Sequence, residues 1–231
     1  YKGGNINNFF EVYKEQAGEF FIILDADMQP FPDMMDIFMG HYFGLPEAER
    51  ERVAFIQTPQ WYRNFNKSHG WTDFFFISEF FFYRILQPAC SYRGCAIYCG
   101  CCGLWNRRAI DSIGGFTEGF ATEDSVTGCK VIRNKVPGQD YNWRGKYVAQ
   151  PVAVGVSPDT LPALMAQRLR WYHGMMQMFA YHNFYIFAKG LTPVQKLMYW
   201  VSCAGWIVNL INYLATLTGT LLSLGSIAWF A

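Results

Sequence analysis

Residues 19–27 read Glu-Phe-Phe-Ile-Ile-Leu-Asp-Ala-Asp. The apolar run over 20–24 is short and ends in acids, which favours a buried β-strand whose carboxyl end carries Asp25 and Asp27. Ligands of open α/β sheets bind beyond the carboxyl ends of the strands. Two carboxylates at that place can hold a hard divalent cation and leave coordination positions for substrate phosphates. Asp pairs also occur in ordinary turns, so the motif needs support from the rest of the chain.

Strand-like and helix-like segments alternate outward from this stretch. Strands are predicted over 52–57, in the region 96–105 and within 146–156, and helices over 33–42, 74–86, 107–113, 122–134 and 161–181. Such alternation favours a layered α/β domain. The 231 residues provide for one sizeable core and a little more.

The charged residues are distributed unevenly. The formal net charge is +1, so composition argues against nucleic acid as a partner. Residues 197–231 carry no charge, and this length is sufficient for a transmembrane helix, with a buried core helix as the alternative. Lys189 and Lys196 precede this run, and the positive-inside tendency therefore places the preceding residues in the cytosol.

Four of the seven cysteines fall within residues 95–102. Cys99 and Cys102 form one Cys-x-x-Cys spacing, but no second such pair occurs and no histidine lies nearby at zinc-ligand spacing, so buried free thiols are favoured over a zinc site. The odd number of cysteines and the cytosolic placement argue against a disulfide framework.

Thr122-Glu123-Asp124 reads as the start of a helix. Thr is a good N-cap, and acids in a first helical turn complement the helix dipole, so a structural role alone explains the triplet. The functional alternative makes Asp124 a general base that deprotonates an acceptor hydroxyl.

Gln167-Arg-Leu-Arg-Trp171 lies in the long predicted helix over 161–181. Gln167, Arg170, Trp171 and Gly174 share one helical face through their spacing. An Arg can bind a diphosphate in a bidentate fork, and a Trp face is a platform for a sugar ring. An amphipathic helix near a membrane explains the arginines but does not require the other three residues to line up.

Taken together, these segments resemble the processive inverting glycosyltransferases of the cellulose synthase superfamily, which share a Rossmann-like GT-A fold. The resemblance rests on Lys-Gly-Gly-Asn-Ile-Asn-Asn (2–8), Asp-Ala-Asp (25–27), Gln-Thr-Pro-Gln (57–60), Tyr-Cys-Gly (98–100), Thr-Glu-Asp (122–124), the Gln-x-x-Arg-Trp motif (167–171) and Leu-Thr-Pro-Val-Gln-Lys (191–196). It runs nearly end to end.

The resemblance implies roles for individual residues. Asp25 and Asp27 would hold Mg²⁺ or Mn²⁺ at the donor diphosphate, and Asp124 would be the base for the incoming 4-hydroxyl. Further donor contacts are expected from Lys2, Gln167 and Arg170, together with Asp25. Acceptor contacts are expected from Cys99, Glu123 and Trp171.

The resemblance also implies an organisation. A GT-A catalytic domain, incomplete at its N-terminus, is expected over 1–160, the Gln-x-x-Arg-Trp helix and an interface helix over 161–196, and a transmembrane segment over 197–231, in a chain cut at both ends. The parent would be a multi-pass plasma-membrane protein with a cytosolic catalytic part. Its expected partners are UDP-glucose, a growing glucan and membrane lipid, with an accessory subunit or a homo-oligomer left open.

The expected product is a β-1,4-glucan. A β-1,3-glucan, chitin, hyaluronan or mannan remains the alternative, because the motifs do not encode the sugar or the linkage. A non-catalytic membrane relative is a further alternative, which the retention of Asp25, Asp27, Asp124 and Arg170 disfavours.

Overall fold

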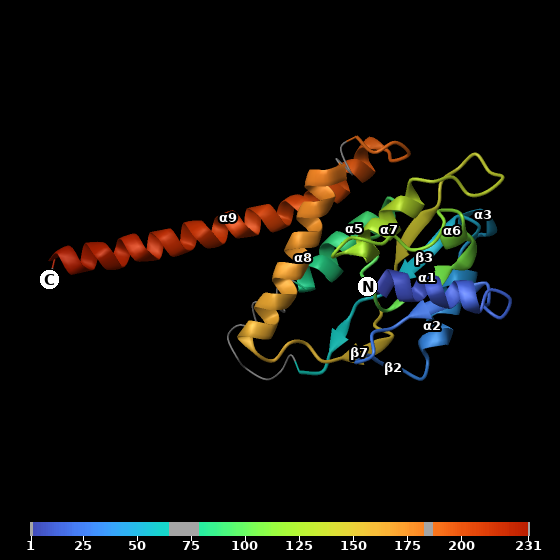
Figure 1. The fold of residues 1–231 in the computed structure, drawn as a ribbon, viewed down its shortest axis with the longest axis horizontal. Helices are drawn as coiled ribbons and strands as arrows, with labels where there is room; N and C mark the ends of the chain where they lie inside the picture. Colours follow the sequence, from blue (N-terminus) through green and yellow to red (C-terminus); the bar gives the residue numbers. More distant parts are fainter. Residues whose placement is uncertain (1, 65–78, 183–186, 231) are drawn as a thin grey trace.

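The computed structural model describes residues 2–64, 79–182 and 187–230 (Figure 1). Its helices are α1 (Lys2–Val12), α2 (Met34–Phe43), α3 (Glu47–Arg50), the π-helical turn η1 (Phe82–Leu86), α5 (Gln87–Tyr92), α6 (Arg107–Asp111), α7 (Glu123–Ile132), α8 (Leu161–His182) and α9 (Pro193–Phe230). Its strands are β1 (Phe20–Ile23), β2 (Gln29–Pro30), β3 (Val53–Gln57), β4 (Trp61–Tyr62), β5 (Gly103–Asn106), β6 (Arg144–Tyr147) and β7 (Ala153–Gly155).

The larger sheet has the strand order β1-β5-β3-β6. Strand β5 runs antiparallel to both of its neighbours, whereas β3 and β6 are parallel. Gly103 at the start of β5 therefore pairs with Ile23 at the end of β1 and with Gln57 at the end of β3. This register brings the segment before β5 to the sheet edge where β1 and β3 end. The smaller sheet has the order β2-β7-β4.

Two apolar clusters form the core, one on each face of the larger sheet. All five residues of β3 are buried, as expected for an interior strand. On β5 the successive residues Leu104 and Trp105 enter different clusters, because side chains alternate along a strand. The Trp105 cluster includes side chains from α6, α7, α8 and α9, and the Leu104 cluster includes Phe38 and Tyr42 of α2.

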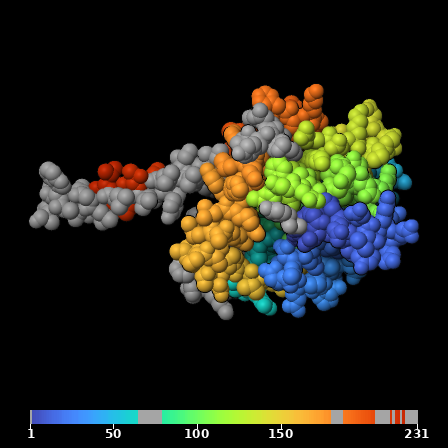
Figure 2. Space-filling model, in the orientation of Figure 1, coloured from blue at the N-terminus to red at the C-terminus, as the bar shows by residue number. Residues whose placement is uncertain are grey.

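Helix α1 packs beside the turn that leads into α7 (Figures 1 and 2). A Cβ atom added to Gly3 would lie 2.8 Å from the carbonyl oxygen of Thr117. The Asn7 amide donates to the carbonyl oxygen of Phe116 at 2.9 Å and accepts the Phe116 N–H at 2.7 Å. These contacts fix the amino-terminal end of α1 against the segment that precedes the Thr-Glu-Asp triplet.

The predicted elements agree with the structure except at three places between residues 74 and 156 and at the start of α9. The region 96–105 is not a continuous strand, because Gly100 and Cys102 have positive φ angles of 76° and 53° and only 103–106 joins the sheet. The segment 146–156 divides between the two sheets, with Pro151 in the break. Of the helix predicted over 74–86, residues 74–78 lie outside the described residues, and the helical segment continues to Tyr92.

Helix α9 is continuous through the boundary predicted between residues 196 and 197. Tyr199 and Cys203 pack into the Trp105 cluster, and the rest of α9 extends away from both sheets (Figure 1). Across the described ranges, no helix combines the length and the apolarity that crossing a bilayer requires. The transmembrane helix predicted over 197–231 is therefore not confirmed.

Candidate active site

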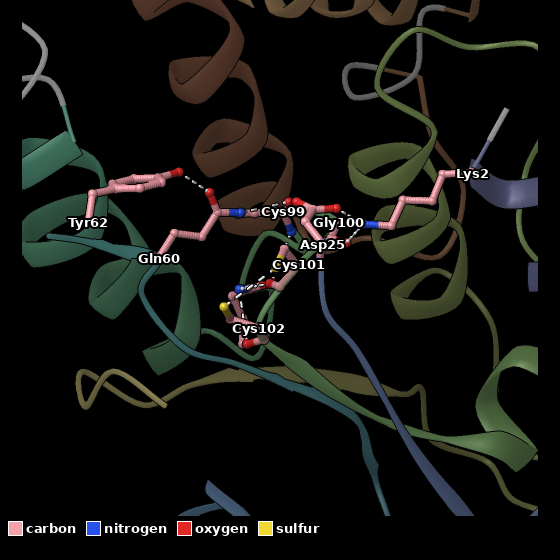
Figure 3. A network of polar contacts seen from close by, with 9 residues as sticks. Lys2, Asp25, Gln60, Tyr62, Cys99, Gly100, Cys101 and Cys102 are labelled. Atoms are coloured by element: carbon pink, nitrogen blue, oxygen red, sulfur yellow. Dashed lines mark hydrogen bonds and ion pairs between the residues drawn. The ribbon is translucent and has the colours of Figure 1, made fainter. Parts of the chain in front are cut away.

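The carboxyl end of β1 carries the first predicted functional group. Asp25 and Asp27 follow this strand and are both exposed. The Asp25 N–H donates to the Sγ atom of Cys101 at 3.2 Å, which ties the strand end to the segment before β5. The Lys2 ammonium donates both to the Asp25 carboxylate and to the carbonyl oxygen of Gly100 (Figure 3). Lys2 thus links α1, the end of β1 and the Tyr-Cys-Gly segment.

Gly100 separates Lys2 from Asp124. Its φ angle is +76°, and a Cβ atom added to it would lie 2.7 Å from the Oδ2 atom of Asp124. A side chain at position 100 would therefore be strained by the backbone conformation and would overlap the carboxylate. The structure accordingly places the Asp124 carboxylate against the same glycine whose carbonyl accepts the Lys2 ammonium.

The Asp124 carboxyl has an unusual environment. Burial raises its pKa to about 6, a hydrogen bond from the Ser125 N–H opposes the rise, the charge of Glu123 adds to it and that of Lys2 lowers it. The Ser125 N–H lies 2.7 Å from Oδ1 and fixes the orientation of the carboxylate in the first turn of α7. A carboxylate with a pKa near the working pH is well suited to accept a proton in the chemical step.

Gln57 organises the Cys99–Cys102 loop from the end of β3. Its side chain is fully buried, donates to the carbonyl oxygen of Cys101 at 2.8 Å and accepts the Cys99 N–H at 2.9 Å. On the outer side, the Tyr62 hydroxyl donates to Gln60, whose amide donates to the Cys99 carbonyl oxygen at 3.3 Å (Figure 3). The Cys99–Cys102 loop is therefore held by side-chain amides in addition to the backbone hydrogen bonds that Cys102 makes with Ile23 and Thr58.

Replacing Gln57 with Leu is expected to destabilise the fold by about 2–4 kcal/mol, because the buried Cys101 carbonyl and Cys99 N–H would lose their partners. Urea denaturation of the purified protein, followed by circular dichroism, measures this change. Gln139→Leu on an exposed turn is the matched control and should change stability by less than about 0.5 kcal/mol. Equal stabilities of the two variants would contradict the role given to Gln57.

Helix α8 docks on the Thr-Glu-Asp segment. A Cβ atom added to Gly174 would lie 2.4 Å from Oγ1 of Thr122, so glycine permits the close approach. One turn further, Gln177 accepts the Ala121 N–H at 3.0 Å. Gly174 of the predicted face thus packs on the start of α7, and Gln177 extends the contact by one turn.

The Gln-x-x-Arg-Trp residues occupy different environments. The Oε1 atom of Gln167 is buried without a hydrogen-bond partner among the described residues. Arg170 is exposed, and no hydrogen bond or ion pair joins it to another described residue. Trp171 is half-buried, with the Arg168 guanidinium carbon 4.9 Å from its ring centroid.

The structure connects some of the predicted residues and leaves others apart. Lys2, Asp25, Cys99 and Asp124 surround Gly100 or adjoin it in the chain. The charge of Asp124 also contributes to a raised pKa of the half-buried Cys99 thiol, for which burial is the main cause. Glu123 acts on the Asp124 pKa, and the described contacts give it no link to Trp171.

Residues 20–231 match the family model described as glycosyl transferase family group 2. The chain belongs to this family. A UDP-forming cellulose synthase catalytic subunit from Komagataeibacter sucrofermentans is 30% identical over an alignment of 205 residues, and the match covers 86% of this chain and 24% of that protein. The corresponding subunit from Xanthomonas axonopodis pv. citri is 28% identical over an alignment of 205 residues, and the match covers 86% of this chain and 25% of that protein. The chain therefore spans about a quarter of the length of these relatives.

Among solved structures, the chain resembles a mannosyltransferase from Pyrobaculum calidifontis in complex with GDP-mannose and Mn²⁺. The TM-score is 0.57 at 18% identity, over 97% of this chain and 60% of the other. At this identity the likeness shows the fold alone, and that fold is the GT-A glycosyltransferase fold predicted from the motifs.

The carboxylates after β1 fit a divalent cation of the kind expected in this family. No group of three or more His, Cys, Asp and Glu side chains converges to hold a metal in the described part of the chain. Mg²⁺ and Mn²⁺ commonly take only one or two carboxylates and complete their coordination with water and substrate phosphates. Asp25 and Asp27, both exposed, provide such a donor set.

An ion pair between Glu79 and Arg168 lies near the site, and the family's motifs do not predict it. Glu79 and Arg168 lie 3.3 Å apart between their charged groups, and neither is among the predicted site residues. A lone acid within the Phe-rich run 74–86 is a usable sequence signal, because a buried carboxylate requires a partner.

Proposed function

We propose that the protein transfers glucose from UDP-glucose to the 4-hydroxyl of a growing β-glucan, with inversion at the anomeric carbon. One observation carries the proposal. The Asp124 carboxylate and the donor-side Asp25 lie on either side of Gly100, which contacts the first directly and is joined to the second through Lys2. A base is thus held next to a place suited to a cation and a diphosphate.

The chemical step requires one base and one stabilised leaving group. The acceptor 4-hydroxyl gives its proton to an Asp124 carboxylate oxygen while its oxygen bonds to the anomeric carbon. The bond between that carbon and the diphosphate oxygen breaks, and its electron pair leaves with UDP. Attack from the face opposite the leaving group converts the α-linked donor into a β-linked product. A divalent cation held by Asp25 and Asp27 would neutralise charge on the diphosphate.

Other residues of the chain bind and orient the two substrates in this proposal. Lys2 adds a positive charge on the donor side, and Arg170 with Gln167 reaches the diphosphate from α8. Trp171 stacks on the terminal acceptor sugar, with Cys99 and Glu123 beside it. The contact of α8 with Thr122 supports this division, because it packs the helix that carries these residues against the segment that carries Asp124.

The choice of glucose and of a processive reaction follows the relatives. These relatives are UDP-forming cellulose synthase catalytic subunits. We propose accordingly a β-1,4-linked product, a plasma-membrane location with the catalytic part in the cytosol, and translocation of the polymer through membrane segments. An accessory subunit or self-association would complete that assembly.

The complete gene product in isolated membranes tests the function. Label is followed from UDP-glucose, UDP-N-acetylglucosamine and GDP-mannose into ethanol-insoluble polymer, with Mg²⁺ or Mn²⁺. We expect incorporation of glucose alone, into material that a β-1,4-glucanase dissolves. Another sugar, or a need for a β-1,3-glucanase, would overturn the substrate or the linkage. No incorporation from any donor would favour the non-catalytic relative.

Removing the divalent cation is expected to lower incorporation at least about 100-fold, because the diphosphate would leave without charge neutralisation. EDTA treatment followed by titration with Mg²⁺ or Mn²⁺ measures the loss and its recovery. Ca²⁺ addition is the comparison, since its longer bonds and higher coordination number suit this donor set less well. Full activity in EDTA would exclude the metal role of Asp25 and Asp27.

A further inference from the structure

Glu79 and Arg168 form an ion pair behind the acceptor side of the proposed site. The Arg168 Nη2 atom donates to the Glu79 Oε1 atom at 3.3 Å, and the two side chains are only 12% and 23% exposed, Glu79 being the less exposed. Glu79 begins the described helical segment 79–92, and Arg168 lies in the middle of α8. A buried charge of this kind is costly to leave without a partner, so the pair fixes the two helices relative to each other.

Arg168 also contacts Trp171. The two residues are three positions apart on α8, and the guanidinium carbon lies 4.9 Å from the indole centroid. A guanidinium stacked over an indole is a favourable cation–π arrangement. The carboxylate of Glu79 therefore holds the cation that lies over the ring of Trp171.

The same region is connected to the Cys99 loop. Tyr62 packs with Leu164, one turn before Arg168 on α8. The Tyr62 hydroxyl donates to Gln60, which donates to the Cys99 carbonyl oxygen. The pair thus contacts Trp171 directly and is connected to Cys99 through Leu164, Tyr62 and Gln60.

We propose that Glu79 and Arg168 are positioning residues that set the orientation of the Trp171 indole for the acceptor sugar. The proposal rests on the acceptor role given to Trp171 above. Neither residue touches the donor in this arrangement, so their loss should affect acceptor engagement and leave UDP binding unchanged. A weakened acceptor contact in a processive enzyme releases the chain earlier and shortens the product.

The first test uses the length of the product and the affinity for UDP. Glu79→Gln keeps the shape and removes the charge, and we expect polymer at least about threefold shorter, with UDP inhibition changed less than twofold. The charge exchange Glu79→Arg with Arg168→Glu should restore part of the length. Glu49→Gln breaks the Lys146–Glu49 pair, which is 2.8 Å long and distant from α8 in the chain, and is the matched control.

A double-mutant cycle separates positioning from a general structural role. In a Trp171→Ala background, Glu79→Gln should have no further effect on product length, because the ring it orients is gone. Additive losses, or an equal loss of UDP affinity, would overturn the proposal. If the active donor proves to be another sugar, the cycle is run with that sugar, so an error in the substrate assignment does not affect its outcome.

A ¹⁹F NMR measurement, which requires no sugar transfer, completes the test. In protein labelled with 5-fluorotryptophan, the ¹⁹F resonance missing from Trp171→Phe identifies residue 171. We expect this resonance to shift in Glu79→Gln while the others stay in place, and not to shift in Glu49→Gln. An unmoved Trp171 resonance would refute the positioning role whether or not the protein transfers a sugar.

Discussion

Replacing Asp124 with Asn is expected to lower the rate of sugar transfer about 10²–10⁴-fold while changing UDP affinity less than about twofold. The amide keeps the size of the side chain but cannot take the acceptor proton. Labelled incorporation from UDP-glucose and UDP competition measure the two quantities separately. Asp111→Asn, an exposed acid at the end of α6, is the control and should retain full activity. A parallel loss of UDP affinity would contradict the assignment of Asp124 as the base.

The pH dependence of the transfer rate tests the same role of Asp124. A base acts in its ionised form, so with a pKa of about 6 for Asp124 the wild-type kcat/KM should rise as pH increases through 6 and level off above about 7. The residual activity of Asp124→Asn should lack this rise. A wild-type profile that is flat between pH 5 and 8 would contradict the carboxylate role.

Thermal unfolding at several pH values distinguishes a chemical loss in Asp124→Asn from a loss of the fold. The folded-state pKa of Asp124 is raised above the ordinary value of 3.8, so the protonated form is favoured in the fold. Its stabilising contribution is full below pH 3.8 and is lost as pH rises through 6. The neutral Asn should therefore make the protein more stable at pH 8 by about 1–3 kcal/mol.

The α/β layering and most helices could be predicted from local patterns, because apolar runs and spacing are read along the chain. The strand β1 and the helices α2, α7 and α8 lie within a residue or two of their predicted bounds. The segment 96–102 could not be predicted in this way. Its apolar residues are buried, but positive φ angles at Gly100 and Cys102 and the amide of Gln57 decide its path. Those are long-range and backbone effects that composition does not encode.

The candidate site, like the fold, could be predicted from the sequence only in part. Residues that share a short motif, such as Glu123 with Asp124, are recognised together in the sequence. The contact of Lys2 with Asp25 and the approach of Gly100 to Asp124 depend on the register of β1 with β5 and on the packing of α1 and α7 beside that sheet edge, which no motif specifies. The pairing of Glu79 with Arg168 likewise joins residues 89 positions apart. The family resemblance supplies roles for residues, whereas the fold supplies their neighbours.

The contact between Gly174 and Thr122 leads to the second large expected effect. Gly174→Ala would place a Cβ atom 2.4 Å from Oγ1 and 2.5 Å from Cγ2 of Thr122, so α8 or the start of α7 must move. We expect the rate of transfer to fall at least about 100-fold, since displacing catalytic groups by about 1 Å is sufficient for such a loss. Stability should fall by about 1–3 kcal/mol from overpacking, less any gain in helix propensity.

Two further variants separate this steric contact from a general effect of alanine in a helix. Gly40→Ala in α2 adds the same atom where nothing lies within 4 Å, and should stabilise the protein by about 0.5–1 kcal/mol with unchanged activity. Thr122→Gly combined with Gly174→Ala removes the atoms that collide and should recover at least about tenfold of the lost rate. Activity and thermal unfolding of the wild type and the three variants measure these effects.

Wild-type activity in Gly174→Ala would mean that the position of α8 against the Thr-Glu-Asp segment does not control the reaction. Recovery in the double variant would establish that the two segments act as one unit, with the acceptor platform on α8 and the base on α7 held in register by a glycine.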